Sequence, residues 1–102
     1  MVTIGHLLEH PGVILKEEFM EPLGISQSKL AREIGVSFVR INEIVRRKRG
    51  FTPDTAIRVA KYFGNTPQFW LHWQSNYDLQ KTLSEHKKEY RRIPSLDHAV
   101  GQ

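Results

Sequence analysis

The feature that most constrains the fold of this chain is residues 26–46, which have the pattern of two short helices joined by a tight turn. Gly35 stands where a chain that leaves a helix needs a left-handed conformation. Ser37 can cap the second helix, and the small side chain of Ala31 lets the two helices cross closely at a steep angle. The residues expected to face inward are Leu30, Ala31, Ile34, Ile41, Ile44 and Val45.

This combination is the pattern of a DNA-binding helix-turn-helix, in which the second helix enters the major groove. A plain pair of antiparallel helices shares some of these features but rarely has Gln27, Ala31, Gly35 and Ile41 together. The charge distribution agrees with DNA binding. Residues 26–61 hold nine basic and three acidic side chains, whereas residues 1–25 hold one basic and four acidic. A localised basic surface is what phosphate binding requires.

The whole chain of 102 residues is long enough for one domain, and its pattern predicts an all-α, five-helix fold. Pro11 suits the first position of a helix that ends near Pro22 and Gly24. A glycine, a threonine cap and a proline recur at Gly50 to Pro53 and at Gly64 to Pro67, so each run ends one helix and starts the next. The other predicted helices span about 27–34, 38–48, 53–63 and 67–87.

These elements divide the chain into three parts. Residues 1–10 are predicted to be a short lead-in, and residues 11–83 the helical domain. Residues 84–102 are charged and interrupted by Pro94, so we expect an irregular or locally extended, partly mobile tail whose few apolar residues include Tyr90, Ala99 and Val100.

The composition argues against several classes of protein. No apolar run approaches the ~20 residues of a membrane span, and the N-terminus lacks the pattern of a signal peptide, so we expect a cytoplasmic protein without a membrane partner. There are no cysteines, and the five histidines show no metal-binding spacing. A phosphate-binding glycine loop and a nucleophile elbow are also missing. We therefore expect no catalytic residues, no metal and no cofactor.

The landmarks together resemble the HigA/VapI antitoxins, a group within the Xre, or lambda-repressor-like, family. The resemblance covers roughly residues 10–80 and implies a dimeric repressor of its own operon that also binds a partner toxin. That toxin would be of the HigB type, a RelE-like RNase that cleaves messenger RNA on ribosomes. The motifs are His10-Pro11-Gly12, Leu23-Gly24, Ser26-Gln27, Leu30-Ala31, Ile34-Gly35-Val36-Ser37, Thr52-Pro53, Phe63-Gly64, Thr66-Pro67-Gln68-Phe69-Trp70-Leu71 and Gln74-Ser75-Asn76-Tyr77-Asp78-Leu79.

The candidate DNA contacts lie on the predicted recognition helix and beside it. Arg40 is the best candidate for a base contact because a guanidinium can bind guanine bidentately; its alternative role is a phosphate clamp or a surface charge. Phe38 and Val39 would meet a thymine methyl or else fill the core, and Glu43 would accept from cytosine or orient Arg40 or Arg47. The full set is Gln27, which resembles the phosphate-binding glutamine of Xre repressors, Ser37, Phe38, Val39, Arg40, Asn42, Glu43 and the basic run Arg46, Arg47, Lys48 and Arg49.

Aromatic residues form a stripe on one face of the last predicted helix. Phe69, Trp70, Trp73 and Tyr77 are more than a small core needs, so we expect part of the stripe to cover residues 53–63 and the rest to form a homodimer interface. A dimer lets two recognition helices bind successive major grooves of a palindromic operator, ~34 Å apart.

The acidic first segment is the candidate toxin-binding surface, because an RNase that holds RNA needs a basic surface. We expect this segment to lie outside the DNA-binding unit. The other candidate for binding the toxin is the tail after residue 84. The candidate contacts are Glu9, Glu17, Glu18 and Glu21, whose alternative role is only to solubilise the first helix. The alternative function is a stand-alone helix-turn-helix regulator or a protein-interaction module without a toxin partner.

Overall fold

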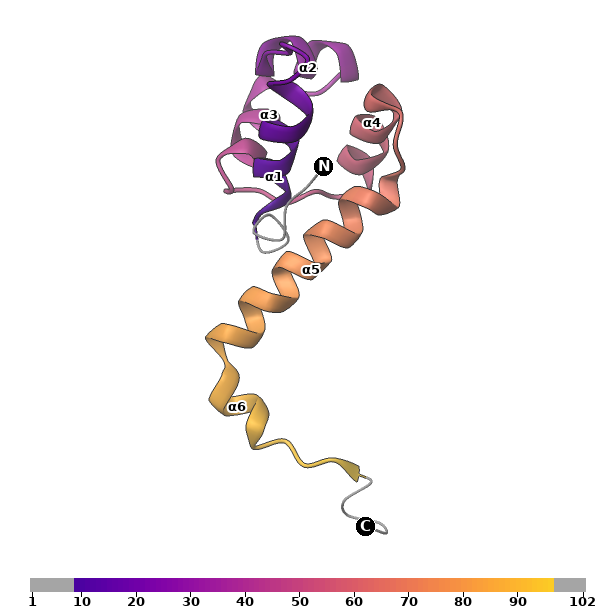
Figure 1. Cartoon of the computed structure of the whole chain (residues 1–102). Helices are drawn as coiled ribbons and strands as arrows, with labels where there is room; N and C mark the ends of the chain where they lie inside the picture. Colours follow the sequence, from indigo (N-terminus) through magenta and orange to yellow (C-terminus); the bar gives the residue numbers. More distant parts are fainter. Residues whose placement is uncertain (1–8, 97–102) are drawn as a thin grey trace.

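The computed structural model describes residues 9–96, and over this range every regular element is helical. Figure 1 shows a bundle of short helices from which one long helix extends. The elements are α1 (Pro11–Ile14), the π-helix η2 (Leu15–Met20), α2 (Gln27–Ile34), α3 (Phe38–Val45), α4 (Pro53–Phe63), α5 (Pro67–Glu85) and α6 (Lys87–Arg91). The all-α prediction is confirmed, with one more C-terminal helix than the five expected.

Local capping signals set the helix boundaries that the sequence predicts well. Gly35 and Gly64 both have the left-handed conformation, with φ of 75° and 79°, and end α2 and α4. Thr52 and Thr66 accept hydrogen bonds from the backbone of the first turns of α4 and α5, each before a proline. The predicted spans 27–34 and 53–63 agree with the structure.

The recognition helix α3 is shorter than predicted. It ends at Val45, and its last turn is closed by Arg47, which has φ of 64°. A left-handed residue stops the regular helical ladder wherever it occurs, so the predicted stop at Gly50 is wrong. The first predicted helix also differs, because it widens into η2 after Ile14 and ends at Met20, ahead of Pro22.

The core is centred on Trp70, whose side chain is completely buried. Its ring stacks on Phe51 with centroids 4.9 Å apart, and its Nε1 donates to Asn65 Oδ1 at 3.0 Å. The first turns of α5 pack against α4, and α1 packs against both α3 and α5. The other fully or largely buried apolar residues are Ile14, Leu15, Met20, Leu30, Ala31, Ile34, Ile41, Ile44, Phe51, Ala56, Val59 and Ala60.

Gly12 allows α1 and α3 to touch through their backbones. A Cβ atom at this position would overlap the carbonyl oxygen of Ile44, near the end of α3. Since backbone cannot move aside as a flexible side chain can, only glycine permits this approach. The contact fixes the recognition helix against the first helix.

Within the predicted irregular tail, residues 84–85 and 87–91 are helical. α5 continues past the predicted domain boundary at residue 83, and α6 follows it directly. Figure 1 shows both projecting away from the bundle, and the longest dimension is 57 Å against 26 and 22 Å. Among the described residues, no helix is both long and apolar enough to cross a membrane. Most of the predicted lead-in, residues 1–8, and the predicted tail end, residues 97–102, lie outside the described range.

We expect acidification to destabilise the fold through His10, which is 4% exposed and whose Nδ1 accepts the Gly12 N–H at 2.9 Å. Burial lowers the pKa of His10 from its ordinary value of 6.5. Below that value the unfolded chain binds a proton that the folded chain does not, so the free energy of unfolding falls until the pH passes the lowered pKa.

The His10→Asn variant tests this expectation, since asparagine also caps helices but does not titrate in this range. Between about pH 7 and pH 5, urea unfolding should show a smaller loss of stability in the variant than in the wild type. Equal losses in the two proteins would rule out a role for His10.

Candidate nucleic-acid interface

Serine caps hold the two helices of the helix-turn-helix. Ser26 accepts the Lys29 N–H at 3.0 Å, and Ser37 accepts the Arg40 N–H at 3.1 Å. On α3, Ile41 and Ile44 are completely buried, whereas Phe38 and Val39 are about half exposed at 49% and 56%. Of the two roles open to Phe38 and Val39, the structure excludes core filling and leaves both side chains at the surface.

Gln27 and Asn42 connect the start of α2 to the middle of α3. Asn42 Nδ2 donates to Gln27 Oε1 at 3.0 Å, and both residues are half-buried. Because Gln27 accepts through its oxygen, its NH₂ group keeps the donor character that a phosphate contact requires. The predicted pair of polar candidates is therefore brought together.

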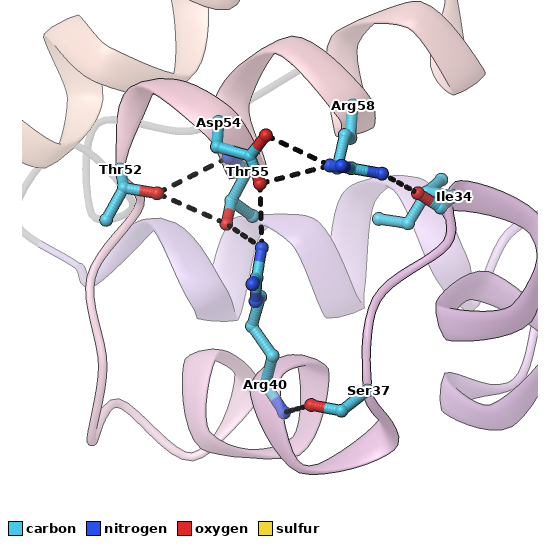
Figure 2. A network of polar contacts seen from close by, with 7 residues as sticks. All are labelled: Ile34, Ser37, Arg40, Thr52, Asp54, Thr55 and Arg58. Carbon is cyan, nitrogen blue, oxygen red and sulfur yellow. Dashed lines mark hydrogen bonds and ion pairs between the residues drawn. The ribbon is translucent and has the colours of Figure 1, made fainter.

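Arg40 points toward α4 (Figure 2). Its Nη1 donates to Asp54 Oδ2 at 2.9 Å and to Thr55 Oγ1 at 3.4 Å. The bonds from Arg40 and then from Arg58 hold the pKa of Asp54 below its ordinary value. In this structure the guanidinium is held by protein groups, so Arg40 is not presented as an unattached base-reading side chain.

Arg58 extends this network to the end of α2. Its Nε donates to both carboxylate oxygens of Asp54 at 3.1 and 3.0 Å, and its Nη1 donates to the Ile34 carbonyl at 2.8 Å. Arg58 also lies close to Gly35, where a Cβ would come within 3.2 Å of Nη1. Asp54 and Arg58 are not among the predicted site residues, although their i, i+4 spacing in a predicted helix indicates an ion pair.

The basic run after α3 is exposed, as expected of phosphate contacts. Arg49 turns back to Glu43 Oε1 at 2.9 and 2.7 Å, and Arg47 approaches Glu9 at 3.8 Å. Glu43 thus orients Arg49, and the predicted pairing with Arg40 or Arg47 is wrong. The intervening loop brings Arg49 back over α3, which sequence spacing alone does not reveal.

The acidic first segment does not lie outside the DNA-binding unit as expected. Because α1 packs on α3, Glu9 and Glu17 line the same hollow as Gln27, Arg46 and Arg47. Farther along, Glu21 is exposed and pairs with Lys16 at 3.6 Å. Glu18 is half-buried. Glu9 and Glu17 thus lie beside the basic run, whereas Glu18 and Glu21 are not among the residues that line this hollow.

The aromatic stripe is mainly an intramolecular feature. Trp70 has no exposed surface in the folded chain, where it packs against Phe19 of η2 and Phe51, so its assignment to a dimer interface is wrong. Trp73 Nε1 donates to the Glu9 carbonyl at 3.1 Å, and Tyr77 meets the edge of the His10 ring. Phe69, Trp73 and Tyr77 remain partly exposed. Metal-binding clusters of three or more acidic or histidine side chains are not found within residues 9–96.

Two substitutions of Arg47 should separate its effect on folding stability, which comes from backbone strain, from its effect on DNA affinity. A non-glycine residue in the left-handed region is destabilising, so Arg47→Gly should raise the free energy of unfolding by up to about 1 kcal/mol, whereas Arg47→Ala keeps the strain. Both variants should bind all DNA sequences more weakly, with a salt slope shallower by about one unit. Binding titrations at several salt concentrations check this, and an unchanged slope would mean that Arg47 makes no phosphate contact.

Comparisons with known proteins agree with this geometry. The helix-turn-helix family profile matches residues 16–70. Virulence-associated protein I of Dichelobacter nodosus is 50% identical over 80 residues, covering 78% of this chain and 72% of the relative. Antitoxin HigA-1 of Vibrio cholerae is 35% identical over 91 residues, covering 89% and 86%.

A solved structure of the Pseudomonas aeruginosa antitoxin HigA with the higBA promoter shares the fold. Its TM-score is 0.84 at 40% identity, and the match covers 87% of this chain and 98% of that one. The family profile spans α2, α3 and α4, the elements that carry the capped turn and the exposed basic run. The chain therefore belongs to the HigA/VapI group of the Xre-like helix-turn-helix family.

Proposed function

We propose that this chain is a sequence-specific DNA-binding antitoxin that represses its own operon. The observation that carries the proposal is the exposed start of α3, where Phe38 and Val39 are at the surface of the helix whose Asn42 binds Gln27 and which an exposed basic run follows. A recognition helix needs this arrangement: side chains free to meet base edges and flanking groups that bind phosphate. The Pseudomonas relative, whose structure includes promoter DNA, supports the same role here.

The proposed contacts divide by chemistry. Ser37, Phe38 and Val39 are at the amino end of α3, where apolar side chains can meet thymine methyl groups. Gln27 and the basic run act on the phosphate backbone, which fixes the orientation of the protein on the duplex. The proposed phosphate contacts are Gln27, Arg46, Arg47, Lys48 and Arg49.

The active form we propose is a homodimer on a palindromic operator. Since Trp70 is buried, the interface must use other parts of α5: the partly exposed Phe69, Trp73 and Tyr77 or the outer half of the helix. The outer half carries Leu79 and Leu83, which are 54% and 43% exposed. Two leucines spaced i, i+4 lie on one helix face and can pack against the same face of a second copy.

The proposed toxin is a HigB-type, RelE-like RNase that cleaves messenger RNA in the cytoplasm. The name antitoxin on the Vibrio relative supports a toxin partner, and the acidic segment offers a surface for a basic protein. We propose Glu17, Glu18 and Glu21 as its contacts. Glu9 is left out because its carboxylate approaches Arg47 of the basic run at 3.8 Å.

Two assays test the proposal and separate it from its alternative. DNase footprinting on the DNA directly upstream of the coding sequence should show protection of a two-fold symmetric site, and a scrambled fragment of equal composition should not. Co-expression with the neighbouring toxin gene should restore growth. Footprinting without growth rescue would support the alternative, a stand-alone regulator, and failure of both would overturn the proposed function.

Charge reversal at Glu17 and Glu18, compared with truncation after Leu83, locates the toxin contact. If helix one docks the toxin, the charge-reversed protein should fail to restore growth while still protecting its DNA site. Full rescue by the charge-reversed protein, with failure of the truncated one, would assign the contact to the C-terminal segment instead.

A further inference from the structure

The network around Arg40 joins three separate helices. Arg40 comes from the first turn of α3, Asp54 from the first turn of α4, and Ile34 ends α2. Figure 2 shows the guanidinium of Arg40 and that of Arg58 converging on the single carboxylate of Asp54. The chain of bonds runs from α3 through α4 to the carbonyl at the end of α2, across the turn of the helix-turn-helix.

The buried base of the network is part of the α4 cap. Thr55, which is 2% exposed, accepts from Arg40 and also contacts the capping hydroxyl of Thr52 at 3.4 Å. The Arg40 side chain is 31% exposed, less than Asp54 at 57%. Arg40 thus reaches inward from α3 to a fixed element, whereas Phe38 and Val39 face outward from the same turn.

We propose that Arg40 is a positioning residue and not a DNA-reading one: through Asp54 and Arg58 it fixes the orientation of α3 relative to α2 and α4, and DNA selectivity comes from its outward neighbours. The proposal rests on the proposed DNA-binding function and assigns a role within it. Arg58 serves as the anchor, because its two bonds to Asp54 and its bond to Ile34 hold the carboxylate in place.

Whether Asp54→Ala strengthens or weakens DNA binding separates a positioning role of Arg40 from direct contact of Arg40 with DNA. If Arg40 binds DNA, removing its intramolecular partner frees a cation and strengthens binding. If Arg40 positions α3, the same change weakens binding to the upstream fragment by about two- to fivefold, the factor that an exposed ion pair supports. Arg40→Ala should weaken it by the same factor, and the double variant should be no worse than either single one.

Salt dependence and a conservative variant give further readouts. Arg40→Ala should leave the salt slope unchanged, because a residue that touches no phosphate releases no counterion. Arg40→Lys retains a donor for Asp54 but cannot bind guanine bidentately, so it should keep most of the affinity. Glu33→Ala is the matched control: it removes an exposed carboxylate that pairs with Lys29 inside α2 and takes no part in the network around Arg40 (Figure 2).

The experiment measures binding of all these proteins to the upstream fragment and to a scrambled duplex, and amide hydrogen exchange of the DNA-free proteins. If Arg40 positions α3, amide hydrogen exchange in α3 should be faster in Arg40→Ala and in Asp54→Ala than in the wild type. Exchange in Glu33→Ala should equal that of the wild type. Stronger binding by Asp54→Ala, a shallower salt slope for Arg40→Ala, or unchanged exchange in α3 would overturn the proposal. A wild type that does not prefer its upstream fragment contradicts the proposed function instead, and the exchange data still decide the role of Arg40.

Discussion

Replacement of Trp70 by alanine is expected to lower the free energy of unfolding by about 3–5 kcal/mol, the cost of removing a completely buried aromatic side chain. The indole packs against Phe19 of η2 and stacks on Phe51, so its loss leaves a cavity and removes the stacked ring. It also leaves Asn65 without the N–H that its Oδ1 accepts. Urea unfolding followed by circular dichroism measures the change.

Trp73→Ala is the matched control, since Trp73 is the next tryptophan on the same helix but only half-buried. It loses one hydrogen bond to the Glu9 carbonyl and part of its packing, so we expect about 1–2 kcal/mol. Equal losses for the two variants would mean that Trp70 is not the centre of the core. A folded, stable Trp70→Ala protein that has become monomeric would instead restore Trp70 to the dimer interface.

The parts of the fold that the sequence predicts well depend on local interactions. The caps at Ser26, Ser37, Thr52 and Thr66 each bind a backbone group only three residues away. The left-handed glycine Gly35 likewise needs only the residues of its own helix to end it. Such signals act within one turn of chain, so they can be recognised without knowing what packs nearby.

The features that the sequence does not predict are those that depend on a tertiary contact. Arg47 adopts a left-handed conformation that no residue preference predicts, and this shortens α3. The position of Arg40 on its helix predicts a DNA contact but not its bond to Asp54, 14 residues away, which holds the guanidinium in this structure. The spacing of Phe69, Trp70 and Trp73 predicts a shared helix face, but it does not show that Phe19 and Phe51 bury Trp70 in particular.

Leu79→Asp combined with Leu83→Asp is expected to abolish the dimer and to weaken binding to the upstream DNA at least about thirtyfold. Specific recognition is worth about 4–10 kcal/mol beyond non-specific binding, and a monomer retains roughly half of the contacts that supply it. Both leucines are about half exposed on the outer part of α5, so the monomer should keep its fold. Analytical ultracentrifugation at micromolar protein and binding titrations give the two readouts.

Ile57→Asp controls for placing charge on an exposed apolar residue, because Ile57 is 52% exposed on α4, away from the outer half of α5. It should leave the protein dimeric and its DNA affinity within a few-fold of wild type. A double leucine variant that stays dimeric would move the interface to Phe69, Trp73 and Tyr77. A monomeric wild type that binds its DNA tightly would remove the need for a dimer, and one recognition helix would then have to supply all the selectivity.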